Sequence, residues 1–132
     1  MSRYKSKPEY KHGDGDAIGV LMVNLGTPKK PTANSVRTYL REFLSDPRVI
    51  EIPKVLWWII LYLFILPFRS FKSAEAYKKI WTNKGSPLLF NSLNIAKKTK
   101  LQLNETHNKE IHLELAMSYG SPSINEVLEG FH

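Results

Sequence analysis

The sequence contains no cysteine, so neither a disulfide bond nor a thiolate metal ligand can be built from its 132 residues. This absence is compatible with a reducing cytoplasm. Acidic residues are also few, 12 against 19 basic ones, which leaves a formal net charge of +7 at pH 7. Such a balance favours anionic partners, among them lipid headgroups, nucleic acid and acidic ligands. Charge alone does not choose among these three classes.

Several motifs that indicate a function are missing as well. The chain has no P-loop, no Gly-x-Gly-x-x-Gly fingerprint and no Ser-His-Asp arrangement. Its four histidines show no ligand spacing, so we expect no metal site among His12, His107, His112 and His132. The basic residues are spread along the chain and no recognition motif accompanies them, so we expect no nucleic-acid partner.

No signal peptide is visible, because the basic N-terminus is not followed by an apolar segment. Pro8, Gly13 and Gly15 also argue against a helical transit peptide. We therefore interpret residues 1–16 as a disordered lead-in. The remaining residues, 17–132, are enough for one modest domain.

The chain does contain a regular order of predicted strands and helices. Residues 17–25 are a short apolar run, typical of a strand buried on both faces, and residues 111–119 alternate with period two. Helical spacing of apolar residues predicts helices over 33–44 and 70–81, from Ser86, and after Pro122. In the helix from Ser86 we expect an inner side made of Leu89, Leu93, Ala96 and Leu103. This order predicts an α/β fold, the opening of a doubly wound parallel sheet. Two strands are few for a stable sheet, so we expect an incomplete part of a larger fold.

A glycine-hydroxyl-proline triplet occurs three times, as Gly26-Thr27-Pro28, Gly85-Ser86-Pro87 and Gly120-Ser121-Pro122. One interpretation is helix capping, since the hydroxyl can accept from free amides and proline suits the first helical position. The other is ligand binding. Two triplets directly follow predicted strands, and ligands of open α/β sheets bind at the carboxyl ends of strands. Both interpretations stay open at this point.

Residues 55–66 form the most unusual segment, because all twelve are apolar or aromatic. Twelve residues fall short of the roughly 20 that span a bilayer. A buried core helix is a second possibility, but two adjacent tryptophans suit a core poorly, since each indole N–H needs a partner. Tryptophan and tyrosine favour the membrane interface, and basic residues flank the segment at Lys54 and Arg69. We expect it to contact a membrane interface or an apolar ligand.

Four blocks of the sequence resemble the ferrochelatase family in the same order and spacing. The first runs from Gly19 to Pro28, the second from Val36 to Ile50, the third from Tyr77 to Leu88, and the fourth from Ala116 to Ile124. The resemblance implies a chelatase-like fold of two similar α/β halves, of which this chain covers most of the first. It also implies that residues 53–68 are the family's hydrophobic lip, with Trp57, Trp58, Tyr62 and Phe64 at its surface.

The resemblance also implies the residues that bind the porphyrin. Leu25 and Thr27 follow the first strand, where the family faces the macrocycle or the incoming metal. Arg69, Lys72 and Ser86 match positions that hold the propionates, and Tyr77 and Tyr119 match aromatic positions in the cleft. One position departs from the family, which usually carries arginine where this chain has Ser118. That change removes one pocket cation.

The function implied by the resemblance is insertion of ferrous iron into protoporphyrin IX, the last step of haem synthesis, by the full-length enzyme. The family's catalytic histidine and its partner glutamate lie in the second half, so we expect no catalytic residue and no bound cofactor in this chain. Its expected partners are protoporphyrin IX, the other half of the enzyme and a peripheral membrane surface. We expect it in the cytoplasm, at the inner face of the membrane. The alternative is a non-catalytic porphyrin- or membrane-binding fragment of a truncated gene.

Overall fold

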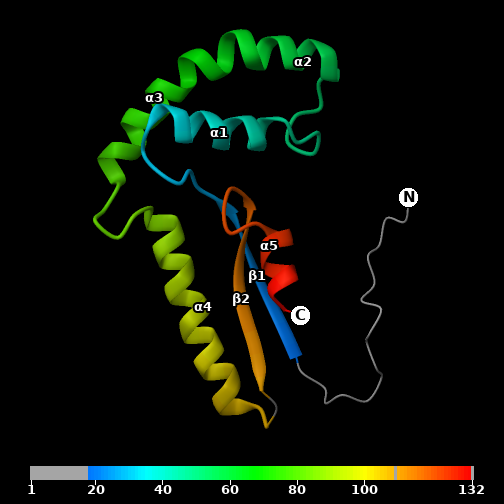
Figure 1. The fold of residues 1–132 in the computed structure, drawn as a ribbon, viewed down its shortest axis with the longest axis vertical. Helices are drawn as coiled ribbons and strands as arrows, with labels where there is room; N and C mark the ends of the chain where they lie inside the picture. Colours follow the sequence, from blue (N-terminus) through cyan, green and yellow to red (C-terminus); the bar gives the residue numbers. More distant parts are fainter. Residues whose placement is uncertain (1–17, 109, 132) are drawn as a thin grey trace.

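The computed structural model describes residues 18–108 and 110–131, and the predicted lead-in over residues 1–16 lies outside this part of the chain. Two parallel strands form a small sheet with helices around it (Figure 1). In chain order the elements are β1 (Ile18–Gly26), α1 (Ala33–Leu44), α2 (Lys54–Ile60), the π-helical turn η1 (Leu61–Ile65), α3 (Leu66–Ile80), α4 (Pro87–Thr106), β2 (Ile111–Tyr119) and α5 (Ile124–Gly130). The predicted α/β class with a parallel sheet is confirmed.

The two faces of the sheet are covered by different helices. Alternate side chains of β2 point to opposite faces, and the apolar set is buried against α4, as the period-two pattern predicts: Leu113, Leu115 and Met117. His112 and Glu114 point to the other face, where α5 lies (Figure 1). Helices on both faces of a parallel sheet make the arrangement doubly wound.

The inner side of α4 differs in one residue from the prediction. Ala96 is buried and Leu89 and Leu103 are partly buried, but Leu93 is 49% exposed, so its predicted place in the core is wrong. Ser92 takes the inward position, one residue and about 100° away from Leu93. A serine and an alanine at this spacing let the helix backbone approach the sheet closely.

The apolar run of β1 predicts burial on both faces, and this prediction is wrong. Val20 and Met22 are partly buried on the side of α4, but other side chains of the strand stay exposed. Val23 and Leu25 are each 48% exposed, and Ile18 is 43% exposed. The sequence of β1 is that of an interior strand of a parallel sheet. The neighbours that would bury it are not among the described residues.

A second core lies beyond the carboxyl ends of the strands, where α1 packs against α3 (Figure 1). The helix α1 begins where the spacing predicts, and the Thr32 hydroxyl accepts from the amide of Ser35 as its N-cap. Its apolar stripe is buried, and consists of Val36, Tyr39, Leu40 and Leu44. This helical layer forms a roof over the end of the sheet.

The hydrophobic lip is part of one continuous helical run, made of α2, η1 and α3. The helix predicted over residues 70–81 is the last part of this run, which ends at Ile80. Pro67 lies inside the run as the second residue of α3, so its position donates no hydrogen bond to the preceding turn. Just before it, η1 widens the helix by one residue, so the amide of Leu66 donates to the carbonyl of Leu61, five residues back.

Candidate functional site

The loops that follow the two strands pack directly on each other. Gly26 and Gly120 have backbone φ angles of 118° and 87°, in the region that favours glycine. A Cβ on Gly26 would lie 1.8 Å from the carbonyl oxygen of Tyr119, and one on Gly120 would lie 2.9 Å from that of Thr27. Only glycine permits this approach, so the triplets after β1 and β2 meet at the carboxyl ends of the strands.

The third triplet joins them through a buried hydrogen bond. The Thr27 hydroxyl donates to the Ser86 hydroxyl over 2.8 Å, and both side chains are 5% exposed. Two predicted porphyrin-binding residues, 59 positions apart in the sequence, are thus brought together. The bond ties the end of β1 to the start of α4.

The capping interpretation of the triplets is wrong for their hydroxyls. Ser86 is the N-cap residue of α4 by position, but its side chain makes no capping bond. The helices after the other two triplets are capped by residues outside them, Thr32 for α1 and Ser123 for α5. The hydroxyls of Thr27 and Ser86 therefore serve the junction of the loops.

Beside this junction lies a polar pair that sequence reasoning missed. The Asn24 amide donates to the Ser92 hydroxyl over 2.9 Å, and the Ser92 hydroxyl donates to the carbonyl of Leu88. The side-chain carbonyl of Asn24 (Oδ1) accepts from the backbone amide of Leu25, whose side chain projects into solvent. A serine within the apolar stripe of a helix was the available signal, since a buried hydroxyl needs a partner.

One face of α1 and its following turn contacts both loops. The Tyr39 hydroxyl donates to the carbonyl of Gly26 over 3.2 Å, and Glu42 accepts from the amide of Gly120 over 3.1 Å. Burial, with Tyr77 and Glu42 nearby, raises the pKa of Tyr39 to about 12. Tyr39 therefore stays a neutral donor throughout the physiological range. Tyr39 and Glu42 are three residues apart, so helical spacing could have predicted that they lie on the same face of α1.

The two predicted aromatic positions lie on the roof side of this junction. Tyr119 stacks edge-on against Phe43 with ring centroids 5.1 Å apart. Tyr77 is half-buried against the core between α1 and α3 and makes an edge contact with Trp81. Burial raises the pKa of the Tyr77 phenol. Both rings are held, so they can form a fixed wall.

The predicted propionate-binding cations lie on α3. Arg69 and Lys72 are both exposed, and neither forms a salt bridge within residues 18–108 and 110–131. Lys72 lines a groove between α3 and the start of α1, together with Thr32, Phe71 and Glu75. Neither cation forms a hydrogen bond with Thr27 or Ser86 among the described contacts. Their role in porphyrin binding stays a prediction.

The four predicted lip residues fall into two groups. Trp57 is half-buried, and its indole N–H donates to the carbonyl of Leu44 over 2.7 Å at the end of α1. Trp58 and Phe64 are each 60% exposed, and Trp58 packs on Tyr62 with ring centroids 4.6 Å apart. Trp57 is thus an anchor to the roof, and Tyr62 also packs against this core. Trp58 and Phe64 make up the outer surface.

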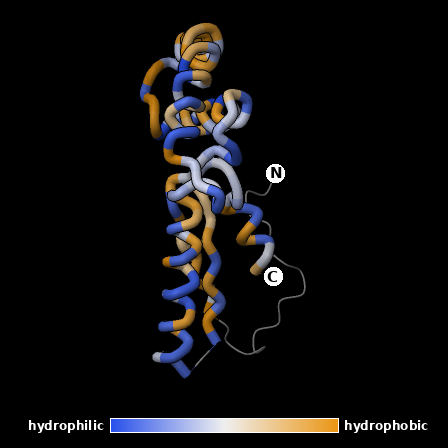
Figure 2. Tube along the Cα trace, turned by 90° about the vertical axis from the view of Figure 1, so that its left-hand side faces the viewer, coloured by the Kyte–Doolittle hydropathy of each residue, from blue (hydrophilic) through white to orange (hydrophobic). Residues whose placement is uncertain are grey.

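Hydrophobic residues gather along this helical run at one end of the molecule (Figure 2). By length and composition, the 27 residues Lys54–Ile80 could cross a membrane. Only the twelve apolar residues 55–66 were counted when a membrane span was set aside from sequence, and the helical run is longer than that. One side of the run, however, is buried against α1, through Leu61, Leu66, Ser70 and Ala74.

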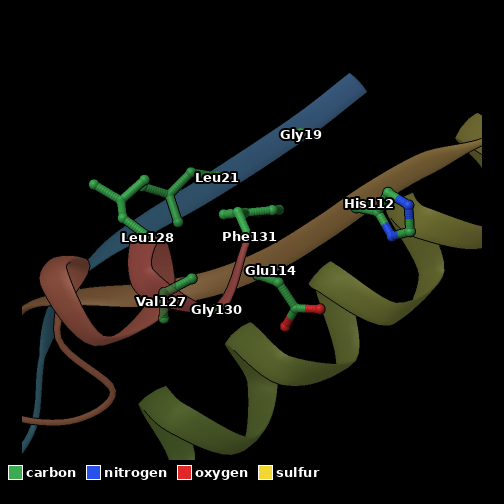
Figure 3. A pocket seen from close by; sticks show the side chains of 8 residues that line it. All are labelled: Gly19, Leu21, His112, Glu114, Val127, Leu128, Gly130 and Phe131. Carbon is green, nitrogen blue, oxygen red and sulfur yellow. The ribbon is translucent and has the colours of Figure 1, made fainter. Parts of the chain in front are cut away.

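A separate cavity of about 620 Å³ lies on the α5 face of the sheet (Figure 3). Its walls include His112 and Glu114 of β2 and Phe131, whose ring lies over Gly19. No group of three or more histidine, aspartate or glutamate side chains that could hold a metal ion occurs in the described part of the chain. His12 and His132 lie outside that part.

Residues 17–132 match the family model described as ferrochelatase. Three similar relatives are each named ferrochelatase: one from Idiomarina loihiensis is 49% identical over 96% of this chain, one from Herminiimonas arsenicoxydans 54% over 95%, and one from Chromobacterium violaceum 48% over 97%. The chain spans only 35%, 34% and 35% of their respective lengths. The chain therefore belongs to the ferrochelatase family of enzymes.

Proposed function

We propose that this chain forms the porphyrin-binding wall of an enzyme that inserts ferrous iron into protoporphyrin IX to make haem. The observation that carries the proposal is the buried bond between Thr27 and Ser86. It places two predicted porphyrin-binding residues at the carboxyl ends of parallel strands, the usual ligand position in an open α/β sheet. Leu25 projects from the same strand end.

The proposed division of roles follows from the chemistry of the substrate. The macrocycle is flat and apolar, so aromatic and aliphatic side chains such as Tyr77, Tyr119 and Leu25 suit its faces and edges. Its two propionates are anions, which suit the guanidinium of Arg69 and the ammonium of Lys72. Neither cation has an acidic partner among the described residues, so both are available to a carboxylate.

Iron insertion also requires a base that accepts the two pyrrole protons. His107 follows the end of α4 and His112 lies near the start of β2, at the end of the sheet away from Thr27 and Ser86. We therefore assign the base to neither of them. In this proposal the described residues bind and orient the porphyrin, and the base and the metal path belong to other parts of the enzyme.

Binding of metal-free protoporphyrin IX to this chain, followed by fluorescence, tests the proposal. Arg69→Ala and Lys72→Ala should each weaken binding, by about 1.5–3 kcal/mol if the bound porphyrin excludes water from the contact. Lys98→Ala, an exposed cation on α4, is the matched control and should leave binding unchanged. Equal affinity in all four proteins would remove Arg69 and Lys72 from the site.

A second assay separates binding from catalysis. With zinc or ferrous iron added, the chain alone should show little or no metal insertion, because the proposed base is absent from its site. Turnover close to that of a complete enzyme would contradict this division of roles. Failure of the wild-type chain to bind porphyrin at all would favour the rival function, a non-catalytic membrane-peripheral fragment.

We also propose that the enzyme works in the cytoplasm and touches the membrane through the outer surface of α2, η1 and α3. Seven large apolar side chains between residues 55 and 71 are more than half exposed, namely Val55, Leu56, Trp58, Leu63, Phe64, Phe68 and Phe71. Exposed apolar patches of this kind favour a membrane or protein contact. Lys54 at the start of the run, with Arg69 and Lys72 farther along it, adds attraction for anionic headgroups.

Contact at the interface is the better interpretation than a span. Crossing the bilayer would remove Leu61, Leu66 and Ala74 from α1 and place Arg69 and Lys72 in hydrocarbon. Each large side chain that enters the interface contributes about 1.5–3 kcal/mol, enough for reversible attachment when a few act together.

Flotation with vesicles tests the membrane contact. The chain should float with phosphatidylcholine vesicles that contain phosphatidylglycerol, and Phe64→Ser with Phe68→Ser should abolish this. Leu101→Ser, which removes a 56%-exposed side chain from α4, is the control and should float normally. A wild-type chain that stays at the bottom of the gradient would rule out the contact.

A further inference from the structure

Among the described residues, the Tyr119 hydroxyl has one hydrogen-bond partner, which fixes its direction. It donates to Asp46 Oδ2 over 2.9 Å, across 73 positions of sequence. Asp46 follows α1, in the turn that leads to Arg48. The side chain of Asp46 is only 11% exposed, although that of Arg48 is 85% exposed. The carboxylate is therefore directed inward, toward the end of β2.

Asp46 itself cannot rotate freely, because all its acceptor positions are used. Oδ1 accepts from the backbone amide of Arg48 over 2.8 Å and from Arg48 Nε over 3.0 Å. Oδ2 accepts from Arg48 Nη2 over 2.7 Å and from the Tyr119 hydroxyl. A carboxylate offers about four such positions, so these four donors saturate it. The side-chain hydrogen bond from Arg48 holds the pKa of Asp46 well below its usual range.

The ring and backbone of Tyr119 are fixed from the same side. Phe43 packs edge-on against the ring, and Glu42 accepts from the next amide, that of Gly120. The carbonyl of Tyr119 lies against Gly26, where a Cβ would not fit. The ring thus has one position, defined by α1 and by the loop after β1.

We infer that Asp46 is a positioning residue, which orients the Tyr119 ring as a wall of the porphyrin site through this hydrogen bond. That the ligand is a porphyrin rests on the proposed function, whereas the position of the Tyr119 ring rests on the contacts described above. The proton of the Tyr119 hydroxyl is committed to Asp46, so it is not available for donation to the porphyrin. Tyr119 therefore acts through its ring.

Titration of the Tyr119 phenol in the full chain tests the geometry without any ligand. The hydrogen bond to Asp46 raises the pKa of Tyr119 above its ordinary 10.0, with a smaller contribution from Glu42 and an opposing one from Arg48. Tyr39 is the other titratable group that faces it from α1. In chain labelled at the tyrosine ring carbons, with the signal assigned by Tyr119→Phe, Asp46→Asn and Asp46→Ala should both lower this pKa. Glu129→Gln on α5 should not.

Porphyrin affinity of the same variants tests the role. Asp46→Ala should weaken binding of metal-free protoporphyrin IX about tenfold, Tyr119→Phe by a similar factor, and the double variant no further. Asp46→Asn keeps an acceptor for the hydroxyl and should lose less than Asp46→Ala. It also guards against an alanine variant that does not fold.

Three results would overturn the inference: an unchanged Tyr119 pKa in both Asp46 variants, unchanged affinity in both, or losses that add in the double variant. A wild-type chain that binds no porphyrin would count against the proposed function instead, and the titration alone would then decide whether Asp46 holds Tyr119.

Discussion

Leu61 and Leu66 are five residues apart in a helical run, yet each is 1% exposed and both lie in the core against α1. In a regular α-helix a separation of five residues would turn the second side chain about 140° away from the first. The π-helical turn η1 between them absorbs one extra residue and brings both to the same side.

Deletion of Phe64, an exposed residue of η1, should therefore be tolerated. Leu61 and Leu66 would then be four residues apart, the spacing that an α-helix needs for a common face. We expect the Tm to change by less than about 3 °C, and thermal unfolding followed by circular dichroism checks this.

The control is deletion of Phe71, which is similarly exposed but lies in the regular helix α3. This deletion turns Ala74 and Tyr77 about 100° away from α1. We expect the Tm to fall by about 10 °C. Similar losses in the two deletions would show that η1 does not set the register.

Alanine at Gly26 should be far more damaging than alanine at Gly85. Both glycines have positive φ, 118° and 95°, so both substitutions carry backbone strain of about 1 kcal/mol. Only Gly26 faces another atom, the carbonyl oxygen of Tyr119, while nothing lies within 4 Å of a Cβ on Gly85. We expect a loss of about 4 kcal/mol or more for Gly26→Ala, against about 1 kcal/mol for Gly85→Ala, by urea unfolding. Equal losses would mean that the two strand loops are not in contact.

The adjacent tryptophans should respond differently to phenylalanine. Trp57→Phe leaves the carbonyl of Leu44 without its donor and should cost about 1–3 kcal/mol of unfolding free energy. Trp58→Phe removes no hydrogen bond to the protein among the described contacts and should cost less than about 0.5 kcal/mol. Fluorescence of the two variants provides a second check, since the emission of Trp58 should be the more red-shifted. If Trp58→Phe proves the more destabilising, the assignment of anchor and surface residue is reversed.

Thr27 and Ser86 should be coupled in a double-mutant cycle. Thr27→Val and Ser86→Ala each leave one hydroxyl without its buried partner, at about 1–2 kcal/mol. The double variant removes both hydroxyls, so its loss should be about 1 kcal/mol smaller than the sum of the single losses. Chemical unfolding of the four proteins measures this coupling. Strict additivity would show that the bond does not contribute in solution.

Local patterns in the sequence were sufficient for most of the elements. The alternation over residues 111–119 and the stripe of residues 33–44 predict β2 and α1 at their observed places. Both signals arise from side chains that face one layer, and a short window of sequence contains them. The likeness to ferrochelatases in four spaced blocks is confirmed as family membership over residues 17–132.

The sequence failed where the outcome depends on distant contacts. Apolar spacing predicts a separate helix over residues 70–81, but the π-helical turn joins this helix to α2 in one run. The apolar run of β1 predicts burial, yet burial of its faces depends on which distant elements pack over them. The bonds from Thr27 to Ser86 and from Tyr119 to Asp46 join residues 59 and 73 positions apart, and no periodicity reports such pairs.

Within the described residues, the edge of β1 away from β2 has no strand partner, which makes it a template for strand addition. An unpaired apolar edge recruits other extended chains, and a sheet of two strands offers little resistance to this. Purified alone, the chain should self-associate as its concentration rises, through the edge that carries Val23 and Leu25. The same property would make that edge the natural place for a complementing segment to be captured, so a peptide of interior-strand composition should keep the chain soluble.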